Sequence, residues 1–270
     1  MTATRERPLL ETVEVVSNDR LAEGVGLMAL HAPRIASAVK PGQFVHVRVE
    51  TRASLILRRP FSVHRAHADH IEILYQVLGA GTLRLAEKHT GDRMDAIGPL
   101  GCGWEVPDNA RHALLVAGGL GAAPLGMLAE ELAERGVAAT VAQGAPTASR
   151  LVARELFERV ARKIEIVTDD GTAGERALVI VPVERLLAEE HFDIVYACGP
   201  EAMQRAVSAL AERAGVACQV SLERLMGCGI GACLSCVVST RQGLKRACVD
   251  GPVFDAREVL WDASEIPPKH

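Results

Sequence analysis

Four of the seven cysteines lie in one glycine-rich segment, MGCGIGACLSCVVSTRQGLKRAC, at residues 226–248. They are Cys228, Cys233, Cys236 and Cys248, with the spacing Cys-x4-Cys-x2-Cys-x11-Cys. The first three match the plant-type arrangement of a 2Fe–2S cluster, in which a tight loop supplies three thiolates and a later residue supplies the fourth. A loop that has to wrap around an inorganic centre constrains the fold more than any other feature of this chain.

The glycines of this segment favour an iron–sulfur cluster over other uses of the thiols. Such a cluster needs soft, deprotonated ligands and backbone N–H groups that point at its sulfides. Gly227, Gly229 and Gly231 let the backbone wrap closely and adopt positive φ. Structural zinc sites usually pair two cysteine knuckles at a distance, whereas here three thiols share one loop. A structural zinc ion and free thiols are the alternatives.

The other cysteines, Cys102, Cys198 and Cys218, stand apart from this segment. Free cysteine is commonly a small buried apolar residue, and this is the first interpretation of all three. Cys198 has a second one, because it precedes Gly199-Pro200 at the carboxyl end of a predicted strand. Ligands bind at such strand ends in parallel sheets.

Composition excludes several classes of protein. The net charge of −4 argues against a general nucleic-acid binder, whose domains are usually basic. The first residues lack the apolar core of a signal peptide. The most membrane-like stretch, residues 113–129, contains glycines and a proline and reads better as strand, turn and helix than as a spanning helix. A cytoplasmic protein with reduced thiols and no membrane contact is therefore expected.

Residues 1–106 are predicted to form a small antiparallel β-barrel. β-Branched or alternating runs, separated by turn signals, occupy residues 9–18, 24–32, 43–50, 59–66 and 70–78. One short helix is expected at residues 81–89.

Residues 107–219 instead alternate strands with helices, which predicts a parallel α/β sheet covered on both faces. The predicted strands are residues 112–119, 137–144, 163–171 and 192–199, and the predicted helices are residues 123–136, 149–161, 182–191 and 200–215. Residues 220–270 form a third, cysteine-rich segment. The fold class is thus a multidomain β plus α/β protein.

One barrel strand carries a group of residues suited to a flavin nucleotide. In RRPFSV, alternation places Arg59 and Phe61 on one face and Pro60 and Ser62 on the other. An arginine and a hydroxyl can hold a pyrophosphate while an aromatic ring stacks on a planar group. The pattern also occurs by chance on edge strands. A later Gly81-Thr82 opens the predicted short helix, either near a phosphate or as an ordinary capped turn.

Two loops at the ends of predicted sheet strands indicate a nucleotide site. VAGGLGAAPL places Gly118, Gly119 and Gly121 between a strand and a helix, and YACGP repeats the theme at Cys198, Gly199 and Pro200. The first loop is not a Gly-x-Gly-x-x-Gly fingerprint and could be a tight turn. Two such loops on one sheet nevertheless make a nucleotide crevice the better interpretation. Arg150, after the second strand, could meet a 2′-phosphate, but a solvated arginine at a helix start is the preferred interpretation.

The order of these motifs resembles that of the ferredoxin–NADP reductase superfamily, and within it the electron-transfer subunits of NAD-dependent dihydroorotate dehydrogenase. The most specific match is SLERLMGCGIGACLSCVV…ACVDGPVFDAREV, from Ser221 to Val259. LRRPFSV, GAGT, TDDG and CGPEAM also match, so the resemblance covers nearly the whole chain.

The resemblance implies particular cofactor contacts. Those to FAD fall on Arg59, Pro60, Phe61, Ser62, Leu74, Tyr75, Gln76, Gly81 and Thr82. The cluster ligands are the four cysteines of residues 226–248. Two departures stand out: Gln76 replaces an arginine that is frequent in the family, and residues 172–182 replace a glycine-richer turn.

The resemblance also implies a function in pyrimidine synthesis. A partner subunit that carries FMN oxidises dihydroorotate to orotate, and electrons pass through the cluster and FAD to NAD⁺, in a heterotetramer with two copies of each subunit. No catalytic acid or base is expected, because the substrates of this chain are electrons. The alternatives are a reductase subunit of another complex, such as a sulfide dehydrogenase, a hydrogenase or a ferredoxin–NADP enzyme, and a redox-sensing binding protein.

Overall fold

A computed structural model describes residues 7–50 and 55–262. In it the first part of the chain is a closed antiparallel barrel with strand order β1-β2-β5-β4-β3-β6. Its strands are β1 (Leu9–Ala22), β2 (Val25–His31), β3 (Phe44–Arg48), β4 (Arg59–Ala66), β5 (His70–Gln76) and β6 (Arg93–Leu100), and its short helices are α1 (Pro33–Ala36) and α2 (Ala80–Ala86). Alternating side chains point into the barrel, where residues such as Val13, Val45 and Ile73 are fully buried in one core.

The second part is a sheet with strand order β10-β9-β8-β7-β11-β12-β15, in which only β15 runs antiparallel to its neighbour. The strands are β7 (His112–Gly118), β8 (Ala138–Ala145), β9 (Lys163–Thr168), β10 (Glu175–Arg176), β11 (Ile194–Cys198), β12 (Ala217–Ser221) and β15 (Val253–Asp255). The helical segments are η2 (Gly119–Leu125), α3 (Gly126–Glu134), η3 (Ala148–Arg150), α4 (Arg154–Val160), α5 (Ile180–Glu189) and α6 (Glu201–Arg213). Residues 172–182 supply the edge strand β10 and the start of α5.

Both faces of this sheet are covered, as the sequence predicts. Leu114 of β7 packs in the core that contains α5 and α6, whereas its neighbour Leu115 packs in the core that contains α3 and α4. The apolar run of β7 therefore serves two cores at once, as expected of a buried parallel strand. None of the helices in the described residues has the length and apolar character needed to cross a membrane.

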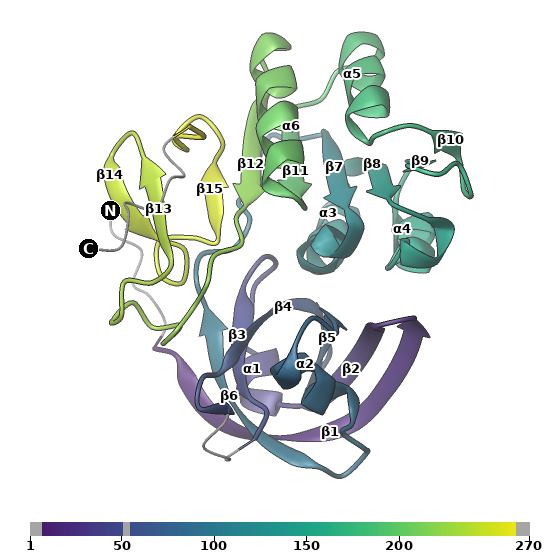
Figure 1. The fold of residues 1–270 in the computed structure, drawn as a ribbon. Coiled ribbons are helices and arrows are strands. Elements are labelled where there is room, and N and C mark those ends of the chain that lie inside the picture. Colours follow the sequence, from purple (N-terminus) through teal and green to yellow (C-terminus); the bar gives the residue numbers. More distant parts are fainter. Residues whose placement is uncertain (1–6, 51–54, 263–270) are drawn as a thin grey trace.

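The cysteine-rich segment leaves the sheet after β12 and returns to it. It forms a loop and a hairpin, β13 (Val237–Thr240) and β14 (Gly243–Arg246), before β15 pairs with β12. The segment of residues 220–270 thus contributes an edge strand to the sheet. In Figure 1 it lies beside both other parts, and a single core joins Phe44 of the barrel, Val238 of the hairpin and Val220 of the sheet.

Polar contacts join the barrel to the sheet domain around η2. The Trp104 indole N–H donates to the carbonyl oxygen of Pro124 at 2.8 Å. His64 of β4 contacts the carbonyl oxygen of Ala123 through Nδ1 at 3.0 Å. Burial lowers the pKa of His64, so the imidazole is neutral and donates from Nδ1. The flavin-type motif on β4 is therefore held directly against the start of the nucleotide domain.

Candidate electron-transfer site

The fold brings the distant fourth cysteine to the loop that holds the other three. Cys236 Sγ and Cys248 Sγ lie 3.2 Å apart, and both residues are buried. The hairpin β13–β14 places them together, because Ala247 donates its N–H to the carbonyl oxygen of Cys236. Cys233 is exposed, and Cys228 is half-buried. The four thiols thus belong to one segment but differ in exposure, from two buried cysteines to one at the surface.

Backbone N–H groups of this loop point at sulfur. Ala232 and Cys233 donate to Cys228 Sγ at 3.3 and 3.4 Å. The backbone N–H of Gly231 contacts the Cys248 thiol, and the Arg246 guanidinium donates to the carbonyl oxygen of Gly231 at 3.2 Å. Gly229 and Gly231 have φ of +73° and +82°, which favour glycine. Four thiols with aimed amide donors are a donor set that fits a 2Fe–2S cluster.

The thiols differ in how readily they ionise. The hydroxyl and backbone N–H of Ser235 lower the pKa of Cys233 to about 6, so this sulfur is a thiolate at neutral pH. Burial, and then the neighbouring Cys236 thiol, raise the pKa of Cys248 to about 12. Metal binding at such a buried pair has to displace protons.

A barrel histidine that the sequence analysis did not single out packs against the cysteine loop. His46 of β3 is fully buried, and its Nδ1 lies 3.3 Å from the carbonyl oxygen of Cys228. Its Nε2 has no hydrogen-bond partner within the described part of the chain. A Cβ at Gly229 would lie 2.4 Å from the ring, so the loop can sit on His46 only with glycine there. Nothing in the sequence around His46, an ordinary strand pattern, could have indicated this contact.

The residues expected to hold FAD surround one end of the barrel. The Arg59 guanidinium donates to the carbonyl oxygens of Leu57 and Arg58, and no carboxylate pairs with it among the described residues. Gly81 leaves the space that this side chain occupies, since a Cβ there would lie 2.7 Å from Arg59 Nε. This cradle leaves the guanidinium's charge available for a pyrophosphate, and in this respect the residues fit FAD.

The remaining flavin candidates lie on β4, β5 and the turn that follows. Phe61 meets Tyr75 edge to face, with ring centroids 6.5 Å apart, and the Tyr75 hydroxyl donates to Asn18. The Thr82 hydroxyl accepts the N–H groups of Leu78 and Gly79, so it caps the turn. Pro60, Ser62, Leu74 and Gln76 complete the set on the two paired strands.

A cavity of about 830 Å³ lies at the carboxyl ends of the parallel strands, the expected place for a nucleotide. Gly118, Gly119 and Pro200 line it from the sheet domain, and Gln76 lines it from the barrel. Residues 172–182, which differ from the family pattern, also reach the cavity, through Leu178, Val179 and Ile180.

Gly121, Cys198 and Gly199 lie behind the cavity wall in a tight packing contact. A Cβ at Gly121 would lie 2.1 Å from the carbonyl oxygen of Cys198, so glycine lets η2 pack on the end of β11. Burial raises the pKa of Cys198 to about 12, which makes this thiol unreactive. Burial raises the pKa of Cys218 likewise, also to about 12.

Arg150 lies in the wall of this cavity. The preferred interpretation from sequence, a solvated arginine at a helix start, was therefore wrong. Its Nη1 atom is buried and has no hydrogen-bond partner within residues 7–50 and 55–262. A buried guanidinium nitrogen without an acceptor is costly unless an anion completes it. The cavity therefore fits a phosphate-bearing ligand.

Comparison with known proteins agrees with this geometry. The family model of the iron–sulfur cluster binding domain of dihydroorotate dehydrogenase B matches residues 223–260. Proteins named dihydroorotate dehydrogenase B (NAD(+)), electron transfer subunit, from Bacillus caldolyticus and Desulforamulus reducens are 40% and 38% identical to the chain. The alignments cover 93% and 87% of this chain and 98% and 92% of those relatives.

A solved structure shares the same architecture over nearly all of the chain. It is described as that of an NADH-dependent reduced ferredoxin-NADP oxidoreductase in work on flavin-based electron bifurcation. It is 33% identical, with a TM-score of 0.85, and the match covers 97% of this chain and 92% of that one. These findings confirm the resemblance seen in the sequence: the chain belongs to the family of electron transfer subunits of dihydroorotate dehydrogenase B (NAD(+)).

Proposed function

We propose that this chain transfers electrons to NAD⁺. It receives them from a catalytic partner that oxidises dihydroorotate. The four cysteines of residues 226–248 would hold a 2Fe–2S cluster, the barrel residues around Arg59 would hold FAD, and the cavity at the strand ends would hold NAD⁺. When bound, the cluster supplies one-electron transfer and the flavin supplies both one-electron and hydride transfer, so the flavin has to lie between the cluster and the nicotinamide.

The observation that carries this proposal is the seating of the cysteine loop on the barrel. His46 of β3 contacts the loop, and β3 pairs with β4, the strand of the flavin motif, with Phe44 opposite Ser62. The nucleotide cavity opens on the same barrel at Gln76. These contacts between residues far apart in the sequence support the proposed order of transfer from cluster to flavin to nicotinamide.

Exposed apolar side chains beside the thiols support docking of the partner there. Four of them project from the cysteine-rich segment, namely Leu225, Ile230, Leu234 and Leu244, each more than half exposed. Such side chains in a segment that also exposes Cys233 are suited to burial against another protein. We propose an FMN-containing dihydroorotate-oxidising subunit as that partner, in an assembly with two copies of each chain.

Coexpression with the dihydroorotate dehydrogenase homologue of the same genome tests the proposal. We expect the two chains to copurify and to reduce NAD⁺ when dihydroorotate is added, with orotate formed in equal amount. The chain alone should contain flavin and acid-labile sulfide, and NADH should bleach its flavin. Copurification without dihydroorotate-dependent NADH formation would contradict the proposal.

A second candidate is a flavin and iron–sulfur subunit of another reductase complex. It is favoured by the match to the ferredoxin-NADP oxidoreductase structure, which covers nearly all of both chains. The same preparation separates the two candidates, because a ferredoxin-linked subunit would exchange electrons with reduced ferredoxin and not depend on dihydroorotate.

Arg150 should contribute to dinucleotide affinity. We expect Arg150→Ala to raise KM for NADH by about tenfold or more while kcat changes little, because the loss of one charge-assisted hydrogen bond costs about 1.5–3 kcal/mol. The measurement is NADH-dependent dye reduction by the FAD-loaded chain. If Arg150 reads a 2′-phosphate, the effect should be larger with NADPH.

Arg154→Ala is the matched control for this prediction. Arg154 lies at the start of α4, half-exposed, where it pairs with Glu158 at 2.7 Å and does not line the cavity. An equal change of KM in both variants, or no change in Arg150→Ala, would contradict the assigned contact.

A further inference from the structure

The hairpin between β4 and β5 gathers four polar side chains on one face. The backbone N–H of His67 donates to the carbonyl oxygen of His70 across a two-residue turn, and Arg65 stands opposite Glu72 two residues further along the strand pair. Because side chains alternate along a strand, those at positions 65, 67, 70 and 72 share a face of the hairpin. The register of the two strands therefore brings two imidazoles and a carboxylate together on one face of the hairpin.

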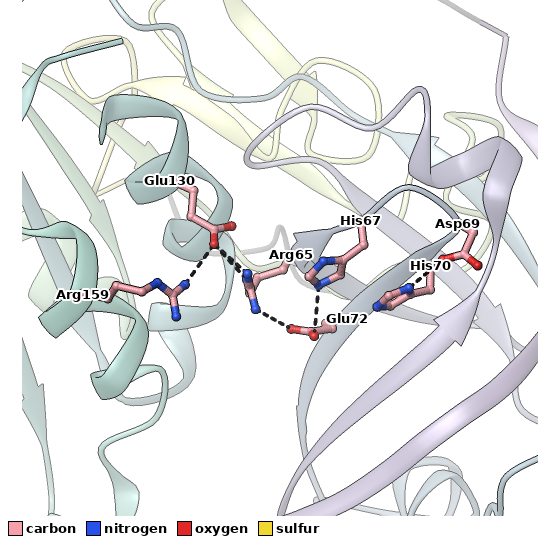
Figure 2. A network of polar contacts seen from close by, with 7 residues as sticks. All are labelled: Arg65, His67, Asp69, His70, Glu72, Glu130 and Arg159. Carbon is pink, nitrogen blue, oxygen red and sulfur yellow. Dashed lines mark hydrogen bonds and ion pairs between the residues drawn. The ribbon is translucent and has the colours of Figure 1, made fainter. Parts of the chain in front are cut away.

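The three potential ligands lie within reach of a single ion (Figure 2). His67 Nε2 lies 3.1 Å from Glu72 Oε1, and the rings of His67 and His70 stack with centroids 4.3 Å apart. One ligand atom from each of the three residues lies within 4.8 Å of the others. The side chains are 30%, 29% and 17% exposed, so the group is held in place and still open to solvent on one side.

The neighbouring arginine contacts two carboxylates but is held more closely by Glu130 than by Glu72, so Glu72 Oε1 stays directed at His67. Arg65 donates to Glu130 of α3 from Nε at 3.0 Å and from Nη2 at 2.8 Å, whereas its nearest contact with Glu72 is 3.8 Å. Glu130 also pairs with Arg159 of α4 at 3.2 Å. Figure 2 shows the guanidinium of Arg65 turned between the two carboxylates.

Asp69 orients the second histidine. Its Oδ1 lies 2.9 Å from His70 Nδ1, so Nδ1 donates to the carboxylate and Nε2 remains the ring nitrogen with a free lone pair. Metal-bound histidines commonly have this arrangement, in which a carboxylate holds the nitrogen that does not bind the ion. A hairpin with two histidines, a carboxylate ligand and an orienting carboxylate has the components of a metal site.

We propose that His67, His70 and Glu72 bind one divalent transition-metal ion, represented by Zn²⁺, with water in the remaining position. Two imidazole nitrogens and a carboxylate oxygen form a set that zinc accepts, with three protein ligands and one open position. Zinc bonds of about 2.0–2.2 Å in a tetrahedral site place ligand atoms roughly 3.4 Å apart, a spacing that His67 Nε2 and Glu72 Oε1 already approach at 3.1 Å. Rotation of the His70 side chain on an unchanged backbone would complete the site. Magnesium, which prefers oxygen ligands, should not bind. This site contains no cluster cysteine, so it does not depend on the proposed electron transfer.

Calorimetric titration of the untagged full chain with zinc chloride tests the proposal. The chain is prepared anaerobically with FAD and iron–sulfur cluster bound, so that its cluster thiols are occupied, and its iron content is measured before and after. We expect one Zn²⁺ per chain. His67→Ala and His70→Ala should each weaken binding by about tenfold or more, and Asp69→Asn by about 10–100-fold, the range found for residues that orient metal ligands.

His191→Ala is the matched control, because His191 is an exposed histidine beside a carboxylate, 3.7 Å from Asp193, and lies outside the hairpin. Its zinc affinity should equal that of the parent chain. Glu72→Gln keeps the side-chain shape and should also weaken zinc binding. This variant tests the site if the histidine variants fail to fold. Equal affinity in the hairpin variants and the control, equal binding of Mg²⁺, or no zinc binding at all would overturn the proposal.

Discussion

Replacing Cys236 with serine is expected to abolish the cluster while FAD stays bound. Cys236 is buried beside Cys248, and a hydroxyl is a poor substitute for a soft thiolate ligand. Iron should fall from about two atoms per chain to near zero, since a 2Fe–2S cluster uses all four ligands. Dihydroorotate-dependent NAD⁺ reduction by the complex should be lost, whereas NADH should still bleach the flavin. Iron analysis, visible absorption and the two activities measure these outcomes.

Cys218→Ala provides the control for general damage to a buried thiol. Cys218 lies in β12, is buried, and takes no part in the cysteine loop. The control should keep iron, flavin and activity. Loss of FAD together with iron in Cys236→Ser would mean that the two sites fold as one unit, and full iron content would remove Cys236 from the ligand set.

Replacing Arg59 with alanine is expected to release FAD. The guanidinium sits in the cradle left by Gly81 and contacts only backbone carbonyls among its described hydrogen bonds, so its charge is available to a pyrophosphate. Each charge-assisted hydrogen bond contributes about 1.5–3 kcal/mol, which corresponds to roughly a tenfold to hundredfold loss of affinity per bond. The ratio of FAD to protein after gel filtration, and titration of the apoprotein with FAD, measure the effect.

Arg93→Ala is the control for this prediction. Arg93 belongs to the same barrel, but it is largely exposed and pairs with Glu14 at 3.2 Å. The control should retain FAD like the parent chain. Retention of FAD by Arg59→Ala, with iron content unchanged, would place the pyrophosphate on other residues.

The elements were predictable from the sequence where a local pattern decides the structure. Alternation indicated β1 to β5 of the barrel, and the strand–helix order indicated the parallel sheet, because both patterns depend only on which side chains face a core. The last barrel strand, β6, and the sheet strands β10 and β12 were not among the predicted strands. The start of α5 was placed two residues late, since Ile180 and Val181 continue an apolar run that sequence alone does not divide. The edge strand β15 was not expected, because its pairing joins residues far from β12 along the chain.

The candidate site also has features that were predictable from local sequence and features that were not. The cysteine spacing indicated the ligand set in advance, because three thiols in one loop are close neighbours in any fold of that loop. The part played by His46 could not be predicted, because it arises where a barrel strand meets the loop of a different segment. Arg150 was expected in solvent, and only the packing of η3 at the strand ends places its Nη1 in the cavity wall.

The chemistry that the chain can carry follows from local sequence: thiols for a cluster, an arginine and an aromatic residue on one strand for a flavin, and glycine loops at strand ends. Those features depend on spacing over a few residues, which the covalent chain sets directly. Their arrangement depends on the folded chain: the cysteine loop packs on His46, the barrel and the sheet share a cavity, and the β4–β5 hairpin brings two histidines beside Glu72. These juxtapositions join residues through packing and strand register, and their positions follow from burial of the whole core rather than from any local pattern.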